Sequence, residues 1–241
     1  MRKIAGRKPV IEALKNDVKI DKLIIGRDIK KSFLTDVLKI AEKKGIEVNF
    51  TDKQGLDDMS ETLNHQGIIA IAGEFEYKEL EDVFALADER GESPFIVILD
   101  EITDVHNLGA IIRTAECLGA HGVVIPKNRA ASVNAVVDKT SAGAVEYLPV
   151  VRVTNITNTL KQLKEKGLWI YGADMSGNVI YKENLTGPIG IVIGNEGKGI
   201  SRLVRENCDA MIKIPMSGKT NSLNASCAAS IMIYDIVRQR G

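Results

Sequence analysis

The sequence lacks the cysteine and histidine patterns of a disulfide-rich or metal-binding protein. Its 241 residues include an odd number of cysteines, widely spaced and without a C-x-x-C pair, namely Cys117, Cys208 and Cys227. Their neighbours are apolar or small, so we expect buried, reduced thiols. Scattered histidines form no ligand pattern either, at His65, His106 and His121. The sequence therefore predicts a reducing compartment and no metal.

Long apolar runs and a net charge are also missing. No stretch approaches the length of a membrane span, and the first residues lack the apolar core of a signal peptide. Lysine plus arginine and aspartate plus glutamate both number 32, so the net charge is zero, which argues against binding long nucleic acid by overall charge. We expect a cytoplasmic protein without membrane contact. Its basic start is either a solvated terminus or an arm that touches RNA, through Arg2, Lys3, Arg7 and Lys8.

Several motifs of nucleotide-binding proteins and hydrolases are incomplete. SGKT at 217–220 resembles the end of a phosphate-binding loop, but Lys213 stands where that loop needs glycine. The run 194–201 has both glycines, but Ile200 stands where the lysine belongs. No G-x-S-x-G occurs, and no G-x-G-x-x-G follows the first predicted strand. A P-loop protein, a serine hydrolase and a Rossmann dinucleotide enzyme are therefore disfavoured.

What the sequence does contain is an alternation of short apolar runs and helical patterns, which is typical of an α/β fold. The near-continuous apolar runs of the second part indicate a parallel sheet buried on both faces. A charged, largely helical stretch without a strand separates the two parts, at 77–93. We expect strands at 22–26, 46–50, 67–73, 95–100, 121–126, 168–174, 189–195 and 210–215. We expect helices at 30–44, 107–119, 154–166, 199–207 and 222–239.

Three loops that follow strands of the second part carry polar residues and glycines, at 99–116, 190–203 and 212–226. In open α/β sheets ligands bind beyond the carboxyl ends of the strands, and glycines let a ligand approach the backbone closely. The loops therefore predict a binding site at this edge of the sheet.

Individual polar residues of these loops also have purely structural interpretations. Asn107 fits a helix N-cap, and Ser222 or Asn221 fits the cap of the final helix. Glu196 fits an acid at a helix N-terminus. Arg113 fits either a surface ion pair or a clamp on phosphate or carboxylate.

The three loops resemble the three motifs of the SpoU (TrmH) family of RNA ribose 2'-O-methyltransferases, within the SPOUT superfamily. The matching residues, in family order, are 104–115, 193–199, 214–216 with 222–226, and a closing Tyr234 with Arg238. Val105 and Ala225 depart from the family's proline and valine at those positions, and neither touches a group that we assign to chemistry.

The start of the chain resembles a small domain of the same family. IAGRKPVIEALKN and HQGIIAIAG look like the ribosomal-protein-L30e-like substrate-binding domain of the branch that contains 23S ribosomal RNA guanosine 2'-O-methyltransferases. The resemblance implies an L30e-like α/β/α domain at 1–75, a linker at 76–93 and a SPOUT domain at 94–241. That SPOUT domain would be an α/β domain with a parallel sheet and a deep trefoil knot, in a homodimer.

The resemblance also implies a reaction and its residues. It implies transfer of a methyl group from S-adenosyl-L-methionine to a ribose 2'-hydroxyl of ribosomal RNA, with a guanosine of 23S ribosomal RNA as the expected target. A transfer RNA ribose 2'-O-methyltransferase and a knotted RNA-binding protein without activity are the alternatives. The residues implied for catalysis are Arg113, Asn107, Glu196, Ser222 and Asn224. Those implied for cofactor binding are Gly194, Asn195, Gly197, Ile214, Met216 and Leu223.

The role implied for Arg113 is that of general base. A guanidinium is normally protonated, so we expect Arg113 instead to hold the substrate phosphate and to stabilise the alkoxide that forms at the ribose.

Overall fold

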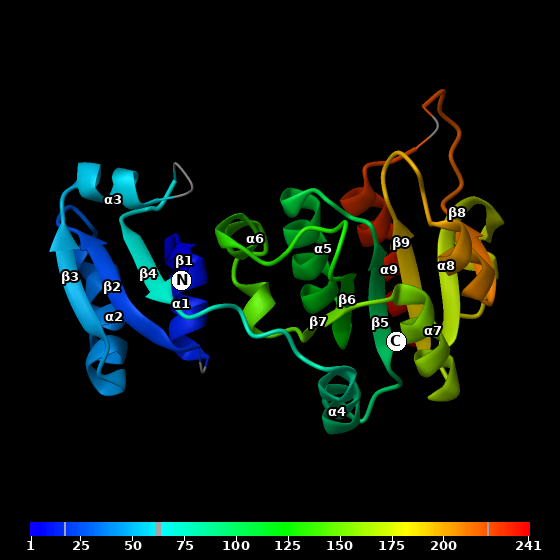
Figure 1. Ribbon diagram of the computed structural model, residues 1–241, viewed down its shortest axis with the longest axis horizontal. Coiled ribbons are helices and arrows are strands. Elements are labelled where there is room, and N and C mark those ends of the chain that lie inside the picture. The colour runs from blue at the N-terminus through cyan, green and yellow to red at the C-terminus, as the bar shows by residue number, and fades with distance from the viewer. Residues whose placement is uncertain (17, 61–63, 221) are drawn as a thin grey trace. The chain divides into compact units, whose positions relative to one another are not determined.

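The computed structural model describes residues 1–16, 18–60, 64–220 and 222–241. Two compact units result, one formed by Met1–Glu76 with Val133–Tyr147 and the other by Tyr77–Ser132 with Leu148–Gly241. Figure 1 draws the elements, which in chain order are β1 (Arg2–Ala5), α1 (Arg7–Lys15), β2 (Ile20–Gly26), α2 (Lys31–Lys44), β3 (Glu47–Thr51), α3 (Lys53–Met59), β4 (Ile68–Ala72), α4 (Leu80–Arg90), β5 (Phe95–Asp100), α5 (Val105–Cys117), β6 (Gly122–Pro126), α6 (Ala135–Thr140), the 3-10 helix η1 (Ala144–Glu146), β7 (Val150–Val153), α7 (Ile156–Glu165), β8 (Trp169–Val179), the 3-10 helix η2 (Ile180–Lys182), β9 (Ile189–Gly194), α8 (Arg202–Asn207), β10 (Ala210–Lys213) and α9 (Ala225–Arg240).

The first unit is built on a four-stranded mixed sheet of order β1-β4-β2-β3. β4 pairs antiparallel with β1 and β2, whereas β2 and β3 are parallel. Aliphatic residues of α1 at helical spacing, among them Val10 and Leu14, share one core with Leu23 and Ile25 of β2. The sequence predicted β2, β3 and β4 and missed β1, because β1 is four residues long and half of it is basic.

The second unit is built on a six-stranded parallel sheet of order β10-β8-β9-β5-β6-β7. The central strand β5 is buried along its whole length. Helices α4, α7 and α8 pack on the face that carries Ile96 and Ile98. Helices α5 and α9 lie together on the other face (Figure 1). The guanidinium of Arg240, from α9, lies over the ring of Phe95, from β5. The predicted α/β fold with a parallel sheet is confirmed, whereas the short edge strand β7 was not predicted.

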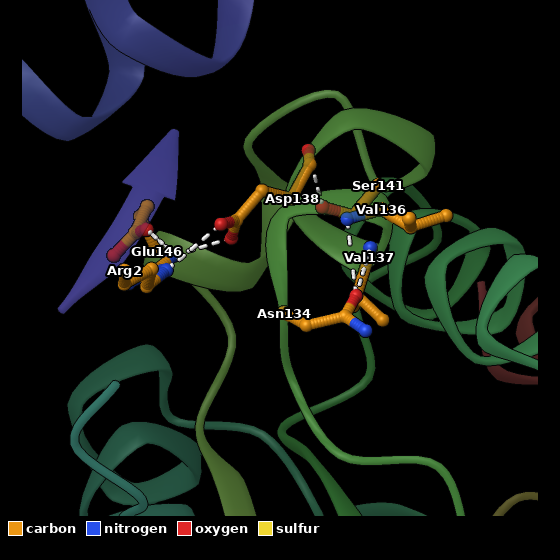
Figure 2. Close-up of polar contacts among 7 residues, drawn as sticks. All are labelled: Arg2, Asn134, Val136, Val137, Asp138, Ser141 and Glu146. Atoms are coloured by element: carbon orange, nitrogen blue, oxygen red, sulfur yellow. Dashed lines mark hydrogen bonds and ion pairs between the residues drawn. The ribbon is translucent and has the colours of Figure 1, made fainter. Parts of the chain in front are cut away.

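The segment Val133–Tyr147 folds with the first unit, although in sequence it lies between two strands of the second. Figure 2 shows the contact: Arg2 of β1 bonds both Asp138 of α6 and Glu146 of η1, with 2.8 Å between Nε of Arg2 and Oδ2 of Asp138. The hydroxyl of Tyr147 donates to Glu12 of α1. The segment thus contacts β1 and α1, which lie far from it in sequence. No local sequence pattern around Arg2 predicts that its partner Asp138 lies 136 positions further along the chain.

Arg2 is neither solvated nor presented to a ligand, because it is 8% exposed. The expectation that it belongs to a solvated terminus or an RNA-binding arm is therefore wrong for this residue, whereas Lys8 is exposed. Burial by itself lowers the pKa of Arg2, but the two carboxylates raise it above its usual value. Burial raises the pKa of Asp138 and of Glu146, and Arg2 opposes that rise.

The prediction that all three cysteines are buried is wrong. Cys117 and Cys227 are exposed, and Cys208 is half-buried. Apolar neighbours in sequence do not decide which face of a helix a residue occupies, and Cys117 and Cys227 lie on outward faces of α5 and α9. Burial raises the pKa of the Cys208 thiol to about 12, and the neighbouring Asp209 adds to the rise.

Within the described ranges, no helix is both long and apolar enough to cross a bilayer. Over the same residues, no three histidine, cysteine, aspartate or glutamate side chains gather in an arrangement that would hold a metal ion.

Candidate active site

The three predicted loops meet at the carboxyl end of the parallel sheet. β5 and β9 are neighbours, and their last residues, Asp100 and Gly194, are register partners. The first two loops therefore leave the sheet side by side. The third loop ends at α9, which packs against α5 and so brings its own polar residues to the same place.

Each loop contributes one residue to a hydrogen-bonded polar cluster. Nδ2 of Asn107 donates to Oε1 of Glu196. Nδ2 of Asn224 donates to Oδ1 of Asn107 at 3.0 Å and lies 3.4 Å from Oε1 of Glu196. Because two amide donors converge on one carboxylate, the Glu196 side chain is held in a defined orientation.

The structural interpretation of Asn107 as a helix cap is wrong. Asp104 caps α5, since its Oδ1 accepts from the backbone N of His106 at 2.6 Å. Asn107 consequently lies inside the first turn of α5, where it is buried and turned toward Glu196. Glu196 in turn is no helix-terminal acid, because α8 begins only at Arg202.

The final helix is capped by Asn224 and not by Ser222. Oδ1 of Asn224 accepts from the backbone N of Ser226 and of Cys227, at 3.0 and 3.3 Å. The amide nitrogen of the same side chain reaches the polar cluster, so Asn224 fixes both the helix start and the site. The alternative cap, Asn221, lies outside the described residues.

A cavity of about 170 Å³ lies next to the polar cluster. The residues predicted for cofactor binding or catalysis that line it are Gly194, Asn195, Glu196, Ile214, Met216, Ser222 and Leu223. Gly197 is not among its lining residues, and its N–H donates to Oδ1 of Asn195 at 3.0 Å. Further lining residues were not predicted from the sequence, namely Ala173, Asp174, Met175, Ile193, Gly199, Lys213, Ala225, Ala228 and Met232. A signal existed for Asp174 and Lys213, because both are charged residues at or near the carboxyl ends of runs that were predicted as strands, 168–174 and 210–215.

The wall of this cavity carries an ionised carboxylate. Partial burial raises the pKa of Asp174, but hydrogen bonds from Ser176 and the charge of Arg205 lower it below its usual value. Apolar side chains such as Met216 and Leu223 supply much of the remaining wall. Asp174 is ion-paired with Arg205, and Lys213 also lines the cavity, so the wall is largely apolar with charges of both signs. Such a wall suits a flat, partly apolar ligand that also carries charged groups.

Arg113 stands apart from the polar cluster. Its side chain, on α5, is exposed, and the described part of the chain offers it no hydrogen bond or ion pair. Beside it, Oγ1 of Thr114 and Oγ of Ser230 lie 3.1 Å apart and tie α5 to α9. The guanidinium is therefore free to bind an anion that approaches from solvent.

A larger cavity, of about 680 Å³, lies along β7 and α7. Its lining mixes basic side chains such as Lys127 and Arg152 with acidic ones such as Glu79 and Glu165, and none of the three loops reaches it. We place the site at the smaller cavity because the polar cluster and the glycine-bearing loops converge there and not at the larger one.

Comparison with known proteins finds a related family for each part of the chain. Residues 94–234 match the SpoU rRNA Methylase family, and residues 3–78 match the family described as "RNA 2'-O ribose methyltransferase substrate binding". The "Putative TrmH family tRNA/rRNA methyltransferase YacO" of Bacillus subtilis is 46% identical over 98% of this chain and 95% of its own. A "Putative TrmH family tRNA/rRNA methyltransferase" of Staphylococcus saprophyticus is 43% identical, again over 98% of this chain and 95% of its own.

A solved structure is similar over almost the whole chain. The SpoU methyltransferase AviRb from Streptomyces viridochromogenes, crystallised in complex with the cofactor AdoMet, has a TM-score of 0.83 and 27% identity, covering 99% of this chain and 90% of its own. The fold, the convergence of the three loops and the matches to both parts of the sequence lead to one conclusion. The chain belongs to the SpoU/TrmH family of RNA methyltransferases.

Proposed function

We propose that this protein transfers the methyl group of S-adenosyl-L-methionine to a ribose 2'-hydroxyl of ribosomal RNA, with a guanosine of 23S ribosomal RNA as the target. The observation that carries the proposal is the meeting of Asn107, Glu196 and Asn224, one from each family motif, beside the glycine-bearing cavity. The alternative substrate, transfer RNA, has support in the names of relatives, which include both kinds of RNA.

The cofactor is S-adenosyl-L-methionine, as in the AviRb complex. Ile214, Met216 and Leu223 would enclose its adenosine, and Gly194 brings the backbone close to it. Glu196, which also lines the cavity, would supply the negative charge that a sulfonium favours, whereas Asp174 is paired with Arg205. When bound, the cofactor supplies a methyl group already activated for attack by an oxygen.

The chain's own residues then have to align the ribose and help to remove the hydroxyl proton. We propose that Arg113 binds the phosphate next to the target ribose and stabilises the alkoxide that forms there. Glu196, oriented by Asn107 and Asn224, would accept a hydrogen bond from the ribose, and Ser222 would contact it from the third loop. As the carbon–sulfur bond breaks and the carbon–oxygen bond forms, the proton of the 2'-hydroxyl leaves to solvent and S-adenosylhomocysteine remains.

The first unit would select the RNA. Its match to a family described as substrate-binding supports this assignment. Only RNA carries a 2'-hydroxyl, and single-stranded loops present bases that a protein can read. Because the net charge is zero, we expect local lysines and arginines to bind the RNA, with a moderate dependence on salt.

We also propose a cytoplasmic homodimer in which the last helix threads through a loop as a trefoil knot. Two apolar side chains on the exposed face of α9, Ile231 and Tyr234, are 43% and 59% exposed, which supports a partner surface there. Asn224 of the third loop contacts Asn107 of the first loop and Glu196 of the second, and such close contact among the three loops supports the proposed knot. Light scattering after size exclusion would show twice the chain mass for the dimer and the chain mass if the proposal is wrong.

The test of function is transfer of labelled methyl from S-adenosyl-L-methionine to unmodified 23S ribosomal RNA and transfer RNA transcripts, followed by mapping of the label. Label on a 23S guanosine ribose is the expected result. Label in transfer RNA alone would show that the protein is a methyltransferase whose substrate is transfer RNA and not ribosomal RNA. No label in either RNA or in ribosome assembly intermediates, with the cofactor still bound, would favour the binding protein without activity.

The division of roles has its own test. Arg113→Ala should lower kcat by about a hundredfold or more, since it removes a transition-state contact. The Kd for S-adenosyl-L-methionine, measured by calorimetry, should stay within about twofold because Arg113 does not line the cavity. Parallel loss of cofactor binding would contradict this assignment.

A further inference from the structure

The loop that carries Glu196 is closed on itself. Backbone bonds join Asn195 and Gly199 in both directions, at 3.0 Å and 2.8 Å. Oδ1 of Asn195 accepts from the backbone N of Gly197 and of Lys198, at 3.0 and 3.2 Å. The closure is tight, because a Cβ on Gly194 would lie 2.3 Å from the carbonyl carbon of Gly199. The backbone of Glu196 therefore moves only if the whole loop moves.

The end of β5 anchors this closed loop at two points. Nδ2 of Asn195 donates to the carbonyl oxygen of Glu101 at 3.0 Å, at the start of the loop. Oδ2 of Asp100 accepts from the backbone N of Ser201 at 2.7 Å, where the loop ends and α8 follows. Asp100 is 4% exposed, so its carboxylate oxygen meets little competition from water. Glu101 keeps a left-handed backbone, at φ 59°, which a non-glycine residue adopts only under constraint.

From these contacts we infer that Asp100 is a positioning residue for methyl transfer: its carboxylate fixes the end of the 195–201 loop and thereby the place of Glu196 in the active site. The inference rests on the proposed function, because it assigns Glu196 a role in that reaction. Asp100 does not line the cavity and belongs to none of the residues predicted for the site. It acts through the loop and not by contact with substrate or cofactor.

The donor and the acceptor of the anchor can be removed separately. Asp100→Ala deletes the acceptor, whereas Asp100→Asn keeps an oxygen that can accept from the same N–H. Ser201→Pro deletes the donor at a residue whose φ of −62° suits proline. Ser201→Ala is the matched control, because it keeps the N–H and its side chain makes no cap hydrogen bond.

We expect Asp100→Ala and Ser201→Pro to lower kcat about tenfold or more, since displacement of a catalytic group by an ångström has effects of this size or larger. Asp100→Asn and Ser201→Ala should stay within about threefold of wild type. The KM for RNA should change little in all four variants. Circular dichroism and cofactor calorimetry on each variant report whether the fold and the cavity persist.

A double-mutant cycle with Glu196→Gln separates positioning from general damage. If Asp100 acts through Glu196, then Asp100→Ala should lower kcat less than about twofold in the Glu196→Gln background. An equal loss of kcat in both backgrounds would overturn the inference, as would a wild-type kcat in Asp100→Ala and Ser201→Pro. Wild-type kcat in Glu196→Gln itself would instead refute the role proposed for Glu196. If Asp100→Ala does not fold, Ser201→Pro takes its place in the cycle.

Discussion

Replacing Arg2 by methionine should destabilise the first unit by more than the loss of a surface ion pair would. The guanidinium bonds two carboxylates whose side chains are 1% and 7% exposed, those of Asp138 and Glu146. Without it, each carboxyl must take up a proton or recruit water. The ordinary pKa of an aspartate carboxyl is 3.8, so protonating it at about pH 7.5 costs about 5 kcal/mol. This cost is the upper limit on the destabilisation that Asp138 can cause. Because relaxation and water entry relieve part of this, we expect a total loss of about 3–5 kcal/mol.

The destabilisation should depend on pH in a defined direction. In the variant, burial unopposed by Arg2 raises the folded-state pKa of both carboxyls above the unfolded-state values, so folding takes up protons. Such a group stabilises the fold most below its unfolded pKa, and that stability is lost as pH rises toward the folded pKa. The slope is about 1.4 kcal/mol per pH unit for each carboxyl that protonates. The variant should therefore lie closer to wild type at about pH 5.5 than at about pH 8.

Urea unfolding followed by circular dichroism at both pH values measures this effect, and hydrogen exchange assigns the loss to the first unit. Lys3→Met is the matched control, because it removes the same charge from the same strand at a less buried position. Adding Asp138→Asn and Glu146→Gln to Arg2→Met should recover much of the lost free energy of unfolding, since no unpaired charge remains. A loss below about 1 kcal/mol at both pH values would refute the reasoning.

Three further outcomes follow from single contacts. Asn134→Ala should lower the free energy of unfolding of the first unit by about 1 kcal/mol in the same urea assay, because Oδ1 of Asn134 caps α6 through the backbone N of Val136 and Val137 at 3.0 and 3.1 Å (Figure 2). Gly194→Ala should abolish cofactor binding in calorimetry, because the new Cβ would lie 2.4 Å from the backbone N of Ile200, while Gly187→Ala, whose Cβ would meet no heavy atom within 4 Å, should leave binding unchanged. Iodoacetamide at about pH 8.5 should alkylate Cys117 and Cys227 before Cys208, whose raised pKa of about 12 keeps it a thiol; equal rates in mass spectrometry would contradict this.

The elements that could be predicted from the sequence are those in which burial alone sets the pattern. FIVILD and IGIVIG are apolar along their length because β5 and β9 are central in a sheet covered on both faces. β1 and β7 escaped prediction because each is four residues long and carries a basic residue, Arg2 in one and Arg152 in the other. The role of Arg2 cannot be seen in any local window, because its partners Asp138 and Glu146 lie 136 and 144 positions further along the chain, in the segment that follows β6.

The same limit explains which parts of the site could be predicted. Glycines and polar residues after apolar strands identify loops at a sheet end, so the three loops were predictable as a set. The role of each side chain was not, because Asp104 and Asn107 both satisfy the local rule for a helix cap. Asp104 caps the helix, and the side chain of Asn107 donates instead to Glu196, 89 positions further along the chain. A capping prediction uses three or four neighbouring residues, whereas the choice between capping and a catalytic role is made by residues brought together only in the folded protein. Residues that look structural in sequence at a strand end, as Asp100 does, are therefore where functional assignments should be tested first.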